Sequence, residues 1–343
     1  MASRADLRPG SAVKTPSPHR HVLVTGGAGF IGSHLVEALL AGGASVTVVD
    51  DLSTGVRANL DVAVHAHPDR VRLVESTVSE WARGAPGFDA AYHLAASVGV
   101  RLVMDDPARA AERNVGETMA LLGWASRTRS PVLFASSSEV YGKGVSSPFR
   151  EDADLLFGPP TSPRWSYGLS KAVDEQMAIA AGARDGFPVV VARFFNTVGP
   201  RQRGRYGMVL PRFVAAACTG RPLEVHGSGR QVRCFGDVRD VVRALPTMLS
   251  TPDCHGKVFN LGSDRPISIE DLARFVVSTL GSRSEVVRVP YSDAFGPGFE
   301  DLEVRIPDIA RARRAIGFDP GITLEQTIRD IAAHLARTPE AIA

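Results

Sequence analysis

The chain has 343 residues, of which 44% are hydrophobic and 22% charged, with a formal net charge of +2. These values are ordinary for a folded globular protein, and the absence of a basic run interleaved with aromatics gives no reason to propose a nucleic-acid partner. The three cysteines show no Cys-x-x-Cys spacing, which argues against a disulfide framework and against a metal site. Residues 1–20 lack an apolar stretch of signal-peptide length and are expected to form a disordered tail.

Along the chain, residues 21–25 predict a strand, the glycine-rich residues 26–32 a tight turn, and residues 33–41 an amphipathic helix. A second apolar strand, residues 46–49, ends at Asp50. This strand, turn, helix and strand are typical of a unit that binds a dinucleotide. No apolar run approaches the roughly 20 residues of a membrane span. We therefore expect a cytoplasmic protein with no membrane partner.

Strands and helices continue to alternate, which predicts an α/β fold with a Rossmann-type, doubly wound parallel sheet. The further predicted strands are residues 71–74, 90–94, 132–136 and 189–194, and the long helices are residues 108–127 and 167–183. We expect a dinucleotide-binding domain over residues 21–198 with a return near 235–262. We expect a smaller C-terminal substrate-binding lobe from residues 199–234 and 263–335.

The glycine-rich turn suits a cofactor that carries a pyrophosphate. Gly26, Gly29 and Gly32 let the backbone turn sharply in front of a helix N-terminus, which attracts negative charge. Asp50 is expected to accept hydrogen bonds from the ribose hydroxyls and to repel a 2′-phosphate. The predicted cofactor is therefore NAD.

A second group of residues predicts the chemistry. Tyr167 and Lys171 lie four residues apart, so they share one face of a helix. A free tyrosine has a pKa of about 10, and a neighbouring ammonium favours its phenolate form. Such a pair is suited to take a proton from a sugar hydroxyl while a hydride leaves the same carbon. The carboxyl group of Glu139, in the run Ser137-Ser138-Glu139, points to a step after that oxidation.

Several motifs together resemble the extended short-chain dehydrogenase/reductase family, whose members modify nucleotide-sugars. They are residues 26–32 (GGAGFIG), 93–96 (HLAA), Asn114, Tyr167 with Lys171, and 195–200 (FNTVGP). The resemblance covers residues 21 to about 335 and implies a tightly held NAD. The residues implied to contact NAD are Gly26, Gly29, Phe30, Ile31, Gly32, Asp50, Asp51, Ser53, Thr54, Gly55, Thr77, Leu94, Ala95, Ala96, Asn114, Tyr167 and Lys171.

The resemblance also implies a UDP-sugar substrate and a homodimer formed through the two long helices. Arg233 and Asn196 are expected to bind the diphosphate of the substrate. His226 stands where these enzymes often place a tyrosine against the base, and an imidazole can stack in the same way. Thr77 is expected to replace an acidic residue that commonly approaches the adenine of NAD.

Members of this family first oxidise C4 of the hexose, and their reactions then diverge. The 4,6-dehydratases usually carry an Asp-Glu pair where this chain has Ser138-Glu139, and the C4 epimerases usually carry a small or apolar residue at the position of Glu139. Ser137-Ser138-Glu139 is similar to the Thr-Ser-Glu segment of UDP-glucuronate decarboxylases. Residues 305–309 (RIPDI) are similar to the Arg-x-Pro-Asp-Ile segment of the same enzymes.

We therefore expect decarboxylation of UDP-glucuronate through a UDP-4-keto intermediate to UDP-xylose, with the 4-keto pentose as a second product if its reduction is slow. Arg305 is expected to orient the C6 carboxylate, since a guanidinium can meet it with two parallel hydrogen bonds. Ser137 is expected to hydrogen-bond the C4 oxygen, Ser138 to help reprotonate C5, and Glu139 to position the ring or a water. The alternatives are a C4 epimerase, a 4,6-dehydratase and a catalytically silent NAD-binding scaffold.

Overall fold

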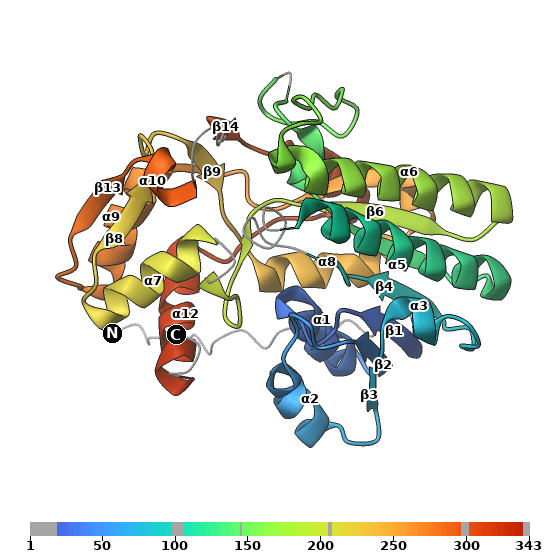
Figure 1. The fold of residues 1–343 in the computed structure, drawn as a ribbon. Coiled ribbons are helices and arrows are strands. Elements are labelled where there is room, and N and C mark those ends of the chain that lie inside the picture. Colours follow the sequence, from blue (N-terminus) through green and yellow to red (C-terminus); the bar gives the residue numbers. More distant parts are fainter. Residues whose placement is uncertain (1–18, 98–105, 145, 205–207, 296–301, 339–343) are drawn as a thin grey trace, which may run out of the picture.

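The computed structural model describes residues 19–97, 106–144, 146–204, 208–295 and 302–338. Its largest element is a seven-stranded sheet in which all neighbouring strands run parallel (Figure 1). Across the sheet the strands are β11 (Lys257–Leu261), β6 (Val189–Phe194), β5 (Val132–Ser137), β4 (Ala90–His93), β1 (His21–Thr25), β2 (Ser45–Asp50) and β3 (Val71–Glu75). The predicted doubly wound parallel sheet is confirmed.

The order of the strands places a switch point beside β1. From β1 the chain builds outward to β2 and β3 on one side, and to β4, β5, β6 and β11 on the other. In such sheets the crevice at the carboxyl ends of the central strands is the usual ligand site. Because all the strands are parallel, Asp50 at the end of β2 and Ser137 at the end of β5 lie at this same edge.

Helices cover both faces of the sheet (Figure 1). One apolar core lies between the sheet and α1 (Phe30–Ala41), α2 (Asp61–Ala66), α8 (Val238–Ser250) and α11 (Ala310–Ile316). The other lies beneath α3 (Val78–Trp81), α5 (Pro107–Thr128) and α6 (Ser166–Asp185). Short 3₁₀ turns are η1 (Arg57–Leu60), η2 (Ser138–Tyr141), η3 (Pro163–Trp165) and η5 (Pro252–Cys254).

A smaller lobe with its own apolar core stands at the carboxyl edge of the sheet (Figure 1). Its helices are α7 (Val209–Thr219), α9 (Ile269–Leu280), α10 (Tyr291–Phe295) and α12 (Leu324–Arg337). Its strands form two small sheets, β8 (Leu223–His226) with β13 (Val286–Val289), and β9 (Val232–Cys234) between β12 (Pro266–Ser268) and β14 (Val304–Arg305). A short ladder of β7 (Thr197–Val198) and β10 (Gly236–Asp237) marks the passage from the large sheet to the lobe.

The structure differs from the sequence expectations in two places. Helix α1 begins at Phe30, three residues earlier than predicted, because Phe30, Ile31 and Gly32 form its first turn and Gly29 is its N-cap. Helix α11 packs into the core of the large sheet, although the sequence places its residues with the lobe. Residues 1–18 of the expected tail lie outside the described residues. None of the described helices is long and apolar enough to cross a membrane.

Candidate active site

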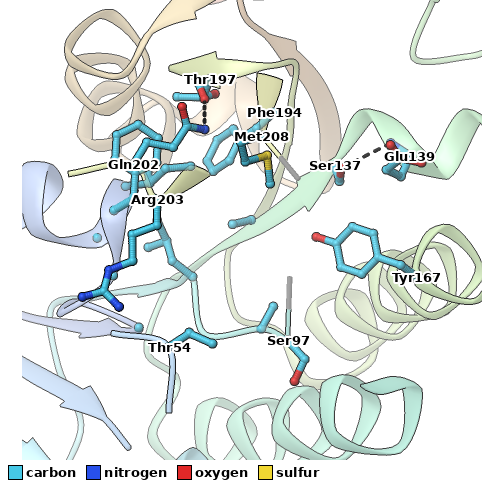
Figure 2. Close-up of a pocket in the computed structure, with 18 of the residues that line it drawn as sticks. Thr54, Ser97, Ser137, Glu139, Tyr167, Phe194, Thr197, Gln202, Arg203 and Met208 are labelled. Atoms are coloured by element: carbon cyan, nitrogen blue, oxygen red, sulfur yellow. Dashed lines mark hydrogen bonds between the residues drawn. The ribbon is translucent and has the colours of Figure 1, made fainter. Parts of the chain in front are cut away.

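A cavity of about 510 Å³ is lined by residues from the carboxyl edge of the large sheet and from the smaller lobe. Figure 2 shows the hydroxyl of Tyr167 pointing into it, with Ser137 and Glu139 nearby and Arg203 on the far side. Each residue predicted to bind cofactor or substrate lines this cavity, with the exception of Lys171. The fold therefore gathers side chains from segments as distant in sequence as Gly26 and Arg305 around one space.

The glycine-rich turn forms a cradle at one end of the cavity. Gly26 has a φ of +70°, which L side chains rarely adopt. A Cβ atom on Gly32 would lie 2.1 Å from the carbonyl oxygen of Gly26, so only glycine fits there. Gly29 precedes α1 without a side chain to cap its first amides. These amides and the helix dipole suit the pyrophosphate of a dinucleotide.

Asp50 is held firmly at the end of β2. It accepts hydrogen bonds of 2.9 Å from the backbone amides of Ala28 and Leu52. Burial raises the pKa of Asp50, and the two amides oppose this rise. A Cβ atom on Gly55 would lie 2.7 Å from Oδ1 of Asp50, so the chain passes close to the carboxylate. The arrangement fits an acid that accepts from ribose hydroxyls.

The neighbouring Asp51 is engaged by a cation that the sequence analysis missed. Arg113, on α5, forms an ion pair with Asp51 and donates a 3.1 Å hydrogen bond to the Ser53 hydroxyl. Arg113 lines the cavity, and its only sequence signal is its place directly before Asn114. Asp51 is therefore paired within the protein, which leaves Asp50 as the stronger candidate for the ribose.

Two further residues predicted to contact NAD also make local hydrogen bonds. The Thr77 hydroxyl caps α3 by accepting from the amide of Glu80 at 3.2 Å. Asn114 is buried, and its Oδ1 accepts from the amide of Ser97 at 2.7 Å. Asn114 thus fixes the loop after β4, while Thr77 lines the part of the cavity next to α3.

The environment of Tyr167 corrects one sequence expectation. Burial raises the pKa of the Tyr167 phenol, the charge of Glu139 raises it further, and the Ser137 hydroxyl opposes the rise. The ammonium of Lys171 lies 3.3 Å from a carboxylate oxygen of Asp174 and 4.0 Å from the centre of the Phe134 ring. The pKa of Tyr167 is thus raised rather than lowered, because burial and the charge of Glu139 outweigh the hydrogen bond with the Ser137 hydroxyl.

Glu139 lies between two arginines. Its carboxylate oxygens are 2.6 Å from Nη1 of Arg164 and 2.6 Å from Nη1 of Arg305. Burial opposes ionisation of Glu139, but the charges of Arg305 and Arg164 outweigh it and lower its pKa to about 2. Glu139 is therefore ionised at neutral pH. The three side chains together carry one net positive charge, and the Nε of Arg305 has no hydrogen-bond partner among the described residues.

The predicted substrate residues occupy the lobe side of the cavity. Arg233 and Arg305 pair in register on β9 and β14, and Arg233 donates to the carbonyl oxygen of Leu302 at 2.8 Å. The Nδ2 of Asn196 donates to the carbonyl oxygen of Cys234 at 3.1 Å. Both side chains are therefore anchored to backbone at the wall of the cavity.

His226 stands between an arginine and a glutamate. Nη2 of Arg212 lies 3.1 Å from its Nε2, and Glu224 lies 3.7 Å away. Burial and the charge of Arg212 lower the pKa of His226. A neutral imidazole at this wall is compatible with the predicted stacking against a base.

The reacting end of the cavity is the part lined by Glu139, Tyr167 and Arg305. Sequence reasoning missed one residue there, Arg164. It lies in η3, three residues before Tyr167, and contributes half of the positive charge around Glu139. Its spacing from Tyr167 is the one signal that would have drawn attention to it, because η3 leads directly into α6.

The switch point, the glycine cradle and Asp50 define a dinucleotide-binding α/β enzyme. The chain belongs to the NAD dependent epimerase/dehydratase family, whose model matches residues 22–262. The family resemblance in the sequence is thereby confirmed.

Individual relatives differ in the reactions that their names state. The chain is 35% identical over 319 residues to the UDP-N-acetyl-alpha-D-glucosaminuronate decarboxylase of Bacillus cytotoxicus, covering 91% of this chain and 96% of that one. It is 33% identical over 326 residues to UDP-glucuronic acid decarboxylase 1 of Danio rerio, covering 94% and 74%. The structure of a dTDP-glucose 4,6-dehydratase from Streptomyces venezuelae with NAD is similar with a TM-score of 0.81, at 30% identity and with 93% and 98% covered. Family membership alone therefore does not fix the reaction of this chain.

Proposed function

We propose that this protein is an NAD-dependent decarboxylase of a UDP-linked hexuronate, with UDP-glucuronate as substrate and UDP-xylose as product. The observation that carries the proposal is the charge at the reacting end of the cavity. Arg164 and Arg305 both pair with Glu139, so two guanidinium groups share one carboxylate in a largely buried place. A C6 carboxylate would balance that charge, whereas the neutral hexose of a C4 epimerase or a 4,6-dehydratase would not.

Arg305 is suited to bind that carboxylate. Its side chain is buried, one nitrogen contacts Glu139, and its Nε has no hydrogen-bond partner among the described residues. A guanidinium presents its donors as a planar fork that matches a carboxylate. Glu139 keeps the guanidinium in place from one side while the substrate approaches another. The low pKa of Glu139 makes it a positioning group rather than a proton donor.

The cavity residues fit NAD, since the glycine cradle and Asp50 offer the amides and the acceptor that its pyrophosphate and ribose require. When bound, NAD supplies a place for the C4 hydride and returns it after the loss of carbon dioxide. Tyr167 would accept the proton from the C4 hydroxyl, and Ser137 would hold the same oxygen. Loss of the carboxylate from the resulting β-keto acid needs no leaving-group acid, which agrees with Ser138 at the place of an aspartate. Ser138 or a water would then return a proton to C5.

The lobe side of the cavity would hold the rest of the substrate. Arg233 and Asn196 would meet the diphosphate, and His226 would face the base. The relative from Bacillus cytotoxicus is named for a 2-acetamido uronate, so a UDP-linked N-acetylglucosaminuronate is the second substrate to be compared. The charge argument holds for both, because both carry a C6 carboxylate.

A homodimer is part of the proposal. Three large apolar side chains are exposed on the two long helices, Met119 on α5 and Leu169 and Val173 on α6. The two helices pack side by side on one face of the sheet (Figure 1). A second copy placed against this face would remove the exposed apolar surface from water.

The experiment that tests the function is incubation of the purified protein with UDP-glucuronate labelled with ¹³C at C6. We expect labelled carbon dioxide together with a UDP-pentose in the proton NMR spectrum. UDP-N-acetylglucosaminuronate, UDP-glucose and UDP-galactose serve as parallel substrates. A product that keeps C6 in every case would overturn the decarboxylase, and interconversion of the two neutral hexoses would identify an epimerase.

A further inference from the structure

Asp174 is a buried carboxylate to which the proposed reaction gives no role. It lies on α6, three residues after Lys171, and none of its side chain is exposed to solvent. Its Oδ2 lies 3.3 Å from the Nζ of Lys171, whose own side chain is 2% exposed. Its oxygens have no hydrogen bond of normal geometry among the described residues. Burial raises the pKa of Asp174, and the Lys171 ammonium and the Thr118 hydroxyl of α5 oppose this rise.

The other charged groups around this pair have their own partners. Glu175, the next residue on α6, binds Arg193 through hydrogen bonds of 2.7 and 2.9 Å. His93, on β4, has a pKa lowered to about 3 by burial and by the charge of Lys171, so it is neutral. On the side of the cavity, Tyr167 is neutral and Glu139 is held by its two arginines. Asp174 is thus the carboxylate that compensates Lys171.

A buried ion pair of this kind is costly to fold. Two charges lose their hydration, and an apolar pair of the same volume is often as stable or more stable. A lysine alone in this place would tend to lose its proton, because burial disfavours the charged form. Its four-carbon stem would also be free to take other rotamers. The carboxylate offsets the first tendency and restricts the second.

We propose that Asp174 is a positioning residue of the C4 oxidation, which holds Lys171 in place and charged on the helix face that carries Tyr167. This inference rests on the proposed oxidation, but not on the later decarboxylation. A C4 epimerase would use Tyr167 and Lys171 in the same way. The two proposals can therefore fail separately.

The expected pH dependence has a definite sign. The charge of Asp174 raises the pKa of Lys171, and it also raises the pKa of Tyr167. The oxidation needs Lys171 protonated, so loss of its proton sets the alkaline limb of the rate profile. Removing the charge of Asp174 lowers the pKa of Lys171. The alkaline limb must then move to lower pH.

The test compares Asp174→Asn with the unaltered enzyme and with Glu175→Gln, a neighbouring carboxylate on the same helix. The measured quantity is kcat/KM across the acid and alkaline limbs, with whichever UDP-sugar the unaltered enzyme turns over. In Asp174→Asn we expect the alkaline limb to fall by about 1–3 pH units, the range for loss of a close opposite charge. Glu175→Gln should move the alkaline limb by less.

Asp174→Glu keeps the charge and should restore limbs close to those of the unaltered enzyme. If Asp174→Asn does not fold, Asp174→Ser leaves room for a water beside the ammonium and carries the same expectation. Lower activity with the alkaline limb unmoved would reduce Asp174 to a structural residue and overturn the inference. An epimerase product with a shifted alkaline limb would overturn the decarboxylase while leaving the role of Asp174 intact.

Discussion

Replacing Arg305 by glutamine tests the charge argument at the reacting end of the cavity. The substitution removes one of the two guanidinium groups around Glu139 and leaves the 2.6 Å pair between Glu139 and Arg164. The remaining pair is neutral, so the buried site loses its net positive charge without leaving Glu139 alone. We therefore expect Arg305→Gln to fold and to lose its preference for a carboxylate.

The size of the effect depends on the burial of Arg305, which is 6% exposed. Removing one partner of a buried, hydrogen-bonded charge pair costs about 2–5 kcal/mol. A loss of about 3–4 kcal/mol in the transition state lowers kcat/KM by about 10²–10³-fold. The glycine cradle and Asp50, which are proposed to hold NAD, lie at the other end of the cavity, so cofactor retention should stay close to that of the unaltered enzyme.

The assay measures kcat/KM for UDP-glucuronate by release of carbon dioxide, beside the NAD content of the purified protein. Arg305→Lys is the matched variant, because it keeps the charge but loses the planar fork. Its kcat/KM should lie between that of the unaltered enzyme and that of Arg305→Gln. Turnover of Arg305→Gln equal to that of the unaltered enzyme would remove Arg305 from the site. An equal loss of NAD and of turnover would show a general structural defect. It would refute the argument that Arg305 affects turnover without affecting NAD binding.

Three further substitutions have defined outcomes. Arg164→Gln should lower turnover about 10-fold or more, because it disturbs Glu139 but keeps the Arg305 guanidinium that would bind the substrate carboxylate. The loss should be smaller than that of Arg305→Gln, and a larger loss would reverse the roles of the two arginines. Gly32→Ala should abolish NAD binding measured by calorimetry, since its Cβ would lie 2.1 Å from the Gly26 carbonyl oxygen. Gly43→Ala is the control, because a Cβ at Gly43 would have no atom within 4 Å. Gly43 has a positive φ, so this variant should lose about 1 kcal/mol of stability but retain NAD. Met119→Glu should shift the mass found by light scattering from that of a dimer to that of a monomer. Val62→Glu is the control, because Val62 is also exposed but lies on α2, and it should leave the mass unchanged. A dimer in both variants would show that the interface does not include Met119.

Local patterns in the sequence were enough to predict where the glycine-rich turn and Asp50 lie. The turn through Gly26 and Gly32 and the acid Asp50 belong to one short strand-turn-helix-strand unit, so their common place at the cavity follows from spacing. The helix position of Tyr167 and Lys171 was also readable from their spacing. The pKa of Tyr167 was not, because burial and the charge of Glu139 arise only when distant segments pack together.

The reacting end depends on contacts that cross the chain. Arg305 was found through a motif resemblance, but its contact with Glu139 joins residues 166 positions apart. Arg164 had no pattern of its own beyond its distance from Tyr167. The residues of α11 were assigned to the lobe together with the rest of residues 263–335, and only the packing of Ala312 against the sheet core shows where they belong. Sequence separation hides such pairings.

The parallel pairing of β14 with β9 has a consequence for how such a protein can change. The residues predicted to contact NAD are complete once the chain has passed the middle, whereas the guanidinium that would choose the substrate comes from Arg305, on a two-residue strand near the end. A change confined to this late strand could alter which sugar is accepted while the cofactor end stayed untouched. In the proposed function, oxidation and the choice of sugar are thus carried by separate parts of one chain, and selection can act on the second without disturbing the first.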